Sequence, residues 1–221
     1  MKTVLKDRLE AGHLLSERLA KFTKTDGLVL AIPRGGVPIA YEIAKDLELP
    51  LEIILTKKIG HPNHPESAIG AVSLNDRILE EYKDVPGLYI AEETARLRRE
   101  LKEKQALYTG NRKPFDVRNK TIILTDDGIA TGKTILLTIK FLRSQQPKAI
   151  ILAIPVMPDE MVKEVVKQVD ELVYIMTPSD FKSVNQFYEH FNQVSDEEVV
   201  LLLNNIVNKK TKTVLQNQHA D

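Results

Sequence analysis

The 221-residue chain carries 31 Lys and Arg residues against 31 Asp and Glu, and 43% of its residues are hydrophobic. This composition is typical of a globular protein rather than a disordered one, and the zero net charge argues against nucleic-acid binding. The chain contains no cysteine, which excludes disulfide scaffolds, thiolate metal sites and cysteine nucleophiles. No apolar run approaches the roughly 20 residues of a membrane span, and residues 1–22 are unlike a signal peptide, so we expect a cytoplasmic protein without a membrane partner.

The first part of the chain is predicted to form a helix followed by two buried strands. Between residues 5 and 22, apolar residues recur at helical spacing and predict an opening helix: Leu5, Leu9, Leu15, Leu19 and Phe22. Residues 28–32 are a short apolar run that ends in Pro-Arg-Gly-Gly, and residues 37–47 keep helical spacing, which predicts a strand, a tight loop and a helix. Residues 51–55 predict a second buried strand.

The next segment is predicted to be a loop and a charged helix. Residues 57–67 contain two lysines followed by glycine, asparagine and prolines, which predicts a long flexible loop. Beyond it, residues 69–72 are expected to pair with residues 78–79. Residues 92–108 are strongly charged, yet Leu97, Leu101 and Tyr108 lie close to one face, which predicts a surface helix.

The second half of the chain alternates predicted strands with predicted helices. The strands are expected at residues 121–125, 149–156 and 172–176, and the helices around residues 135–142 and 161–169. This alternation predicts a parallel, doubly wound α/β sheet, and the continuous apolar strands indicate burial on both faces. Aromatic residues after Thr177 and a helix starting near Ser195 predict a small cap, and residues 208–221 are polar and expected to fray.

One segment combines acidic, glycine and threonine residues at the end of a predicted strand. Asp126 and Asp127 follow the strand, and a Gly/Thr loop then leads into a helix. Ligands bind at this end of the strands in open α/β sheets, and loop N–H groups at a helix N-terminus cradle phosphate. Two adjacent carboxylates accept hydrogen bonds from a cis-diol. The motif therefore predicts a ribose 5-phosphate site, with the phosphate bound by Gly128, Ile129, Ala130, Thr131, Gly132, Lys133 and Thr134.

Two other interpretations of this segment stay open. In the first, Asp126 and Asp127 only form a turn and a helix N-cap. In the second, the segment is a Walker A loop of a P-loop kinase, which requires Gly, four residues and then Gly-Lys-Thr. Asp127 stands where the first glycine should be, and a carboxylate there would repel a triphosphate. The strict pattern fails, so the kinase is the less favoured hypothesis.

The sequence resembles the type I phosphoribosyltransferases. Residues 126–134 are similar to the superfamily's 5-phosphoribosyl-1-pyrophosphate (PRPP) motif, whose acidic pair holds the ribose hydroxyls and whose loop holds the 5′-phosphate. Other segments resemble a bacterial and archaeal group of predicted phosphoribosyltransferases: Asp7-Arg8, Ala11-Gly12, residues 31–38, residues 68–71 and residues 195–199. The resemblance covers nearly all of the chain before Asn208. It implies a Rossmann-like parallel sheet flanked by helices, with a small hood.

The loop after the first strand is where this family binds pyrophosphate. The resemblance implies that Arg34, Gly35 and Gly36 form this site, with a cis peptide between Pro33 and Arg34. Small residues let the backbone approach an anion closely, and the arginine offers planar, forked donors. The alternative is a simple strand-to-helix turn.

Two lysines are the remaining candidates for a catalytic role beside Asp126 and Asp127. Lys57 and Lys58 begin the loop that closes over the reacting centre in such enzymes. We expect them to meet the charge that develops on the departing pyrophosphate. The alternative is that both are ordinary surface lysines.

Other side chains bear on the acceptor and on metal binding. The candidates for stacking on a base, or alternatively for the core of the cap, are Phe181, Tyr188 and Phe191. His61, His64 and Glu66 resemble a loose metal-ligand set, but a proline-rich loop is a poor preformed site, so we expect no protein metal site and leave the role of the histidines open. Ala130 replaces the carboxylate by which 6-oxopurine transferases meet the purine N7. This departure weakens a hypoxanthine or guanine assignment and leaves adenine-type and pyrimidine-type acceptors open.

These features predict a phosphoribosyltransferase, a pentosyltransferase that displaces pyrophosphate from PRPP with a nucleobase-like nitrogen nucleophile. Its cofactor would be Mg²⁺, bound largely through substrate oxygens. We expect a homodimer whose only other partners are PRPP and the acceptor. The alternative is a non-catalytic PRPP- or nucleotide-binding regulatory module. The expected organisation is a hood helix at 1–22, a core at 23–178, a second hood segment at 179–207 and a flexible tail at 208–221.

Overall fold

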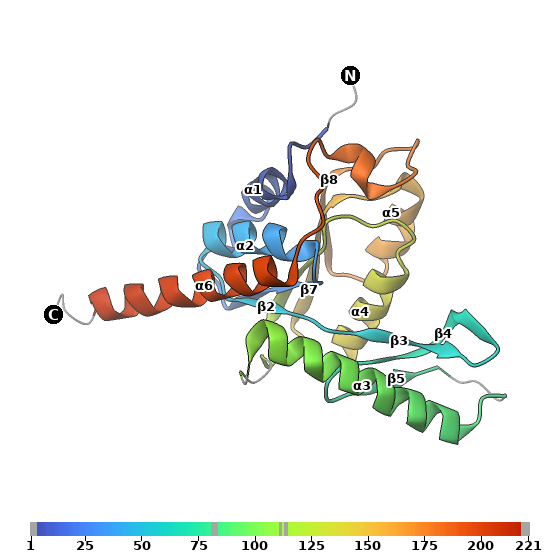
Figure 1. Ribbon diagram of the computed structural model, residues 1–221. Helices are drawn as coiled ribbons and strands as arrows, with labels where there is room; N and C mark the ends of the chain where they lie inside the picture. Colours follow the sequence, from blue (N-terminus) through green and yellow to red (C-terminus); the bar gives the residue numbers. More distant parts are fainter. Residues whose placement is uncertain (1–3, 81–83, 111, 113–114, 218–221) are drawn as a thin grey trace.

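The computed structural model describes residues 4–80, 84–110, 112 and 115–217, and a five-stranded parallel sheet lies at its centre (Figure 1). The strand order is β2-β1-β6-β7-β8. These strands are β1 (Gly27–Ala31), β2 (Leu51–Ile53), β6 (Thr121–Thr125), β7 (Ala149–Val156) and β8 (Glu171–Met176). All five residues of β1 are buried, as expected of a strand covered on both faces. The predicted α/β class is confirmed.

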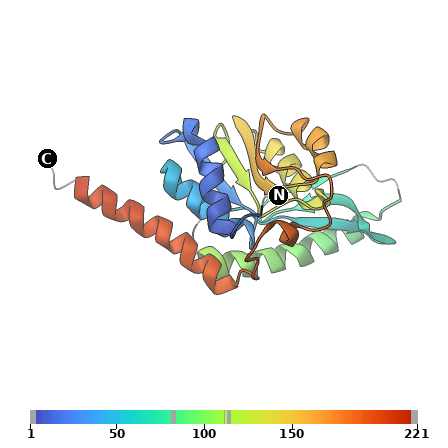
Figure 2. The same cartoon turned by 90° about the horizontal axis from the view of Figure 1, so that it is seen from above.

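Alternate residues of the central strands point into two separate cores, which the helices complete. Val29 and Ala31 of β1 pack with α1 (Arg8–Arg18), α2 (Gly36–Leu47) and α6 (Asp196–Asn217). Leu28 and Leu30 pack on the other side with α4 (Lys133–Ser144) and α5 (Asp159–Val166). Figure 2 shows these helices on opposite faces of the sheet. Because strand side chains alternate between faces, one apolar run supplies both cores. No helix in the described part of the chain is long and apolar enough to span a membrane.

The segment expected to be a flexible loop is a β-hairpin, so that prediction is wrong. Strand β3 (Lys57–His61) pairs antiparallel with β4 (His64–Val72), which also pairs with β5 (Arg77–Leu79). The pairing of residues 69–72 with residues 78–79 is confirmed. The glycine and prolines that suggested a loop are accommodated by a two-residue turn and by register shifts on either side of Gly60.

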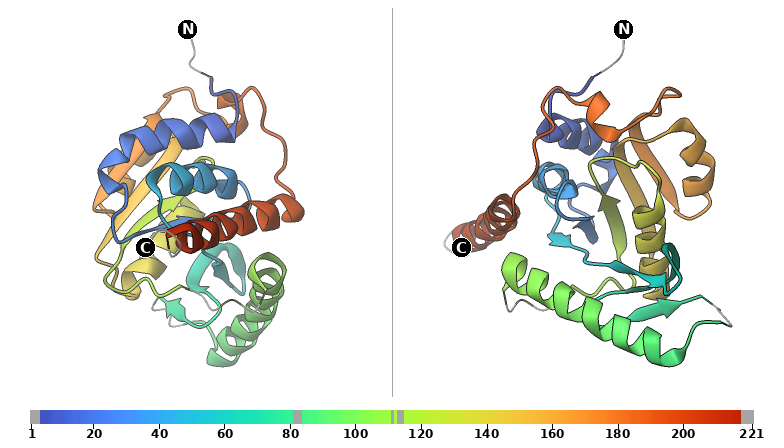
Figure 3. Two further views of the ribbon diagram at one scale, coloured as in Figure 1. Left: turned by 90° about the vertical axis from the view of Figure 1, so that its left-hand side faces the viewer. Right: turned by 45° about the vertical axis from the view of Figure 1, so that its right-hand side comes forward.

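A long helix covers this small antiparallel sheet. Helix α3 (Gly87–Thr109) buries Leu97 and Leu101 against Ile59 and Val72, which form a third core. Figure 3 shows α3 and the small sheet as a layer beside the parallel sheet. The surface helix predicted from its charges and its leucine spacing is confirmed.

The two ends of the chain meet in the part of the molecule expected to be a hood. Leu5 donates its N–H to the carbonyl of Phe187 (2.9 Å) and accepts from the N–H of Glu189 (2.8 Å). The contacting segment follows β8 and includes a short 3₁₀ helix, η2 (Val184–Phe187). A second 3₁₀ helix, η1 (Ala20–Phe22), follows α1.

Helix α6 extends beyond the body of the molecule (Figure 2). Its helical backbone continues to Asn217, and the flexible tail expected at residues 208–221 stays a prediction. No glycine or proline interrupts residues 208–217, and the lysine, leucine and glutamine residues among them favour helix. Residues 218–221 lie outside the described part of the chain.

Candidate functional site

The site lies where β1 and β6 end side by side. These two strands pair in parallel from Gly27 with Thr121 to Ala31 with Thr125, so the loops that follow them emerge together. The N–H of Ile32 donates to the carbonyl of Thr125 (3.0 Å). A Cβ on Gly36 would lie 2.8 Å from that same carbonyl oxygen. Only glycine permits this approach, which brings the two loops into contact.

Asp126 and Asp127 each keep one carboxylate oxygen available. The N–H of Asp127 donates to Oδ1 of Asp126 (2.8 Å), and Oδ2 of Asp127 accepts from Nε (3.0 Å) and Nη2 (2.8 Å) of Arg8. No other residue in the described part of the chain donates a hydrogen bond to Oδ2 of Asp126 or to Oδ1 of Asp127. The pair therefore presents two adjacent acceptors that are suited to the two hydroxyls of a cis-diol.

Burial shifts the protonation of both carboxyls. Burial raises the pKa of Asp126 well above its usual range, and the negative charge of Asp127 raises it further. Burial also raises the pKa of Asp127, but its hydrogen bonds and ion pair with Arg8 act in the opposite direction. The side chain of Asp127 is 18% exposed, so a ligand can reach it. Arg8 thus favours the charged form that accepts hydrogen bonds.

Arg8 is a site residue to which the sequence analysis gave no role. It lies in the first turn of α1, donates through Nη1 to the carbonyl of Asn192 (2.8 Å), and its guanidinium lies 3.9 Å from the centre of the Phe191 ring. Tyr188 donates its hydroxyl to the carbonyl of Asp127 (2.7 Å). Both ends of the chain therefore hold Asp127. Arg8 and Asp127 are 119 residues apart, so no local pattern indicates the contact.

The loop from Gly128 to Gly132 leads from the acidic pair to α4. The N–H of Ile129 donates to the carbonyl of Val156 (2.9 Å), which anchors the loop on β7. Gly132 has a φ of +71°, and a Cβ there would lie 2.2 Å from Cε of Met161. Within the described residues, the backbone N–H groups from Ala130 to Thr134 have no acceptor. The loop and the first turn of α4 thus present several N–H groups without acceptors beside the carboxylates, an arrangement that suits an anion.

The loop after β1 contains the cis peptide bond between Pro33 and Arg34 that the resemblance implied. Nη1 of Arg34 lies 3.6 Å from Oδ1 of Asp196, at the start of α6. Asp196 also accepts from the Tyr108 hydroxyl (2.6 Å) and from Nζ of Lys104 (2.9 Å), and these two hydrogen bonds lower its pKa. Asp196 and Tyr108 had no predicted role at this site, because Asp196 meets Arg34, and Tyr108 meets Asp196, only through tertiary structure.

The two candidate lysines lie on the small sheet rather than on a mobile loop. Lys57 forms an ion pair with Glu100 of α3, and Lys58 is exposed at the next position of β3. Figure 1 shows β3 running past α4 into the small sheet. Their assignment to catalysis stays a prediction.

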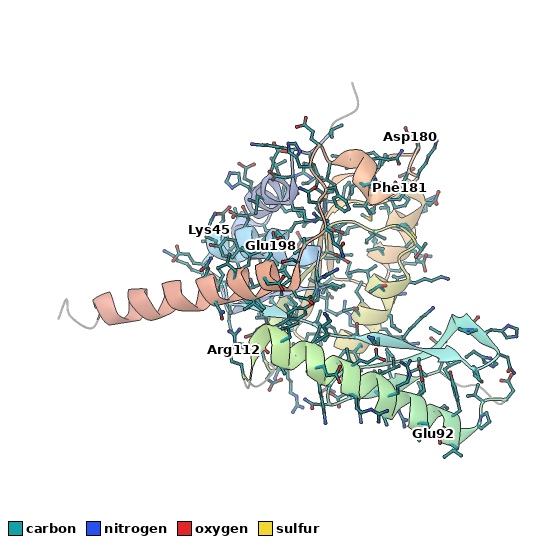
Figure 4. The ribbon with its side chains drawn as sticks, viewed as in Figure 1. Lys45, Glu92, Arg112, Asp180, Phe181 and Glu198 are labelled. Atoms are coloured by element: carbon teal, nitrogen blue, oxygen red, sulfur yellow. The ribbon has the colours of Figure 1, made fainter. Side chains whose placement is uncertain are left out.

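The aromatic candidates pack mainly within the segment that follows β8. Phe181, labelled in Figure 4, stacks on Phe187 with 5.6 Å between ring centres. Tyr188 is 6% exposed, and its ring centre lies 5.0 Å from that of Phe191. Tyr188 is thus placed to support Asp127, whereas stacking of Phe181 or Phe191 on a base stays a prediction.

The two histidines lie at the turn of the β3–β4 hairpin. Their ring centres are 5.4 Å apart, and Nε2 of His61 is 3.3 Å from Oδ2 of Asp84. In the described part of the chain, no three His, Asp or Glu side chains gather as a metal site. The side chain of Glu66 lies outside the described structure.

A family model and two curated relatives indicate the same family. The phosphoribosyl transferase domain matches residues 4–192. Two Mycobacterium tuberculosis proteins, from strains CDC 1551 and H37Rv, are each named "putative phosphoribosyl transferase" and are 35% identical over 204 residues. The match covers 89% of this chain and 46% of each relative, so the chain spans about half the length of those proteins. The crystal structure of TT1426 from Thermus thermophilus matches with a TM-score of 0.83 and 33% identity, over 91% of this chain and 98% of that one.

Proposed function

Because the chain belongs to the phosphoribosyl transferase domain family, we propose that it transfers the phosphoribosyl group of PRPP to a nitrogen of a nucleobase-like acceptor. The observation that carries this proposal is the pair of available oxygens on Asp126 and Asp127 beside a loop of unused N–H groups. The carboxylates are poor partners for phosphate, while the loop suits it. A ribose 5-phosphate places two hydroxyls and one phosphate where both requirements are met.

The adjoining loop supports binding of the pyrophosphate. Arg34 is partly exposed and extends from the end of β1, next to the strand that carries the acidic pair. The absence of side chains at Gly35 and Gly36 lets this loop pack against the Asp127 carboxylate and the Thr125 carbonyl, which keeps it in contact with the acidic pair. Phosphate, ribose and pyrophosphate would therefore lie in a row across the ends of β6 and β1.

The proposed reaction exchanges one bond at C1 of the ribose. The bond from C1 to the pyrophosphate oxygen breaks with its electron pair on the pyrophosphate. The acceptor nitrogen forms the new bond to C1, and its proton passes to the released pyrophosphate. Asp126 and Asp127 would orient the ribose, while Arg34 would offset charge on the leaving group. Such catalysis depends on positioning and electrostatics rather than on a protein nucleophile.

Magnesium fits this site only as a partner of the donor. The described residues supply no cage of three acidic or histidine ligands, and Asp126 and Asp127 are assigned to the ribose. Mg²⁺ commonly binds through substrate phosphates and waters, where it neutralises their charge. The ion would therefore enter with PRPP.

The acceptor is narrowed by Ala130, which is exposed at the loop beside Asp127. An alanine offers no carboxylate to a purine N7, so we propose an adenine-type or pyrimidine-type acceptor.

We also propose that the protein is a homodimer. Light scattering, which measures the molar mass in solution, tests this proposal.

The second candidate is a binding protein that keeps the donor site without catalysing transfer. The observation that favours it is Lys57, whose ammonium is paired with Glu100. A panel of nucleobases with PRPP and Mg²⁺, read by pyrophosphate release, separates the two. Release with one acceptor supports the enzyme, whereas donor binding without release on the whole panel supports the binding protein.

Asp127→Asn tests the donor site itself. The charged hydrogen bond that it weakens is worth roughly 1.5–3 kcal/mol, so we expect about tenfold or greater loss of PRPP affinity in calorimetry. Asp159→Asn, an exposed carboxylate in the first turn of α5, is the matched control and should leave the affinity unchanged. Equal PRPP affinity in the wild type and in Asp127→Asn would refute the site.

A further inference from the structure

A second concave surface lies between α3 and the turn before β5, on elements that contribute nothing to the acidic pair. Its cavity has a volume of about 670 Å³. Small side chains of α3 leave room in it, and cations line it. The lining residues that matter here are Arg77, Ala91, Ala95, Arg98, Arg99 and Lys102. Figure 4 shows this helix with Glu92 near one end and Arg112 just beyond the other.

The cations of this groove share one face of α3. Residues 91, 94, 95, 98, 99 and 102 follow each other at helical spacing, and this stripe contains no acidic residue. The neighbouring face is different, because Arg96 pairs with both Glu93 and Glu100. Within the described structure, Arg98, Arg99 and Lys102 form no ion pair. Charge on α3 is therefore balanced on one face and uncompensated on the other.

Two of the arginines are fixed in the groove by neutral partners. Nη2 of Arg98 donates to the carbonyl of Asn75 (3.1 Å), and Nη1 of Arg77 donates to the Thr94 hydroxyl (3.3 Å). Nε of Arg98 is buried and has no hydrogen-bond partner. The acidic residue in the lining, Asp76, accepts from the Gln145 side chain (3.1 Å). These contacts hold the guanidinium groups in place without neutralising them.

We propose that this groove binds a phosphate-bearing small molecule. Buried donors without acceptors and clustered like charges are both unfavourable, and a bound oxyanion relieves both. Guanidinium groups match the oxygens of phosphate through paired, forked hydrogen bonds. Three arginines and one lysine around a short groove fit two or three linked phosphates. The proposal is independent of the proposed transferase activity.

Inorganic triphosphate is the probe, followed by amide chemical shifts in the full-length protein. We expect the shifts to cluster at residues 75–77 and 91–102, whatever happens at the donor site. Arg99→Gln combined with Lys102→Gln should lower the affinity of the groove for triphosphate by about tenfold or more, because charged hydrogen bonds are each worth roughly 1.5–3 kcal/mol. ATP is titrated in parallel. If ATP binds with the same affinity as triphosphate, the groove recognises phosphates alone; if ATP binds more tightly, it recognises a nucleotide.

The matched control removes two positive charges elsewhere, at lysines that are paired with carboxylates. Lys21→Gln with Lys24→Gln removes two cations that face Glu171 and Glu48, and should leave triphosphate binding unchanged. Thermal unfolding without anions adds a second readout: the groove variant should unfold at a higher temperature than the control variant. Shifts confined to residues 33–36 and 126–134, or equal weakening by both double variants, would overturn the proposal.

Discussion

Asp127 is held by residues from three distant parts of the chain, and its geometry depends on all of them. Arg8 anchors one carboxylate oxygen, Tyr188 anchors the backbone carbonyl, and Gly35 leaves the space that the carboxylate occupies. Removing any one of them should change ligand affinity more than it changes the fold. The glycine provides the sharpest case.

Gly35→Val is expected to damage PRPP binding more than stability. A Cβ at this position would lie 2.0 Å from Oδ2 and 2.5 Å from Cγ of Asp127, so the carboxylate must leave its place beside Arg8. We expect at least about tenfold weaker PRPP binding, together with an overpacking cost of about 1–3 kcal/mol. Calorimetry and urea unfolding measure the two effects. Retained affinity with lost stability would contradict this account.

Asp126→Asn is expected to stabilise the protein at neutral pH while it weakens donor binding. Because the folded-state pKa of Asp126 is raised, its ionisation is unfavourable in the native state, and the wild type loses stability as pH rises through that pKa. Asparagine avoids this cost, so we expect a gain of about 0.5–2 kcal/mol at pH 7 that disappears on acidification. Thermal unfolding at a series of pH values provides the measurement. A gain that grows toward low pH would contradict the direction.

The elements that could be predicted from sequence are those defined by their own residues. Strands β6 and β7 begin and end where the apolar runs at 121–125 and 149–156 do. The loop prediction for residues 57–67 failed because the glycine and prolines of this segment indicate turns locally. Its strands form through pairing with residues up to 79 and packing on α3, which no local window contains.

Gly12→Ala tests how closely α1 packs on α2. A Cβ on Gly12 would lie 2.8 Å from Cβ of Glu42 and 2.8 Å from the carbonyl oxygen of Ile39, so α1 must move away from α2. We expect a loss of about 1–3 kcal/mol, although alanine favours helix over glycine by about 1 kcal/mol. Gly87→Ala, where nothing lies within 4 Å of the added Cβ, is the control. Urea unfolding should show loss for Gly12→Ala and none for Gly87→Ala.

The site is assembled by contacts between segments that lie far apart in the chain. The positions of the acidic pair and of the loops after β1 and β6 could be predicted, because each occupies a short segment at a strand end. The supports could not, because Arg8 reaches Asp127 across 119 residues and Tyr108 reaches Asp196 across 88. Contacts between the segment before α1 and the segment after β8 bring Arg8, Tyr188 and Phe191 together.

Arg8→Gln tests whether this closure sets the charge of the site. Without Arg8, the pKa of Asp127 should rise further, because the hydrogen bonds and the positive charge that oppose burial are lost. A carboxyl with a raised pKa is protonated at higher pH, so we expect PRPP affinity to fall at least about tenfold, with a larger deficit at pH 6 than at pH 8. Titration of the PRPP phosphates affects wild type and variant alike and cancels in the comparison. Arg18→Gln removes the same charge from the same helix, where the arginine donates to the carbonyl of Tyr174, and should retain wild-type affinity at both pH values. A deficit that is equal at pH 6 and pH 8 would mean that Arg8 only orients Asp127, and an unchanged affinity would remove it from the site.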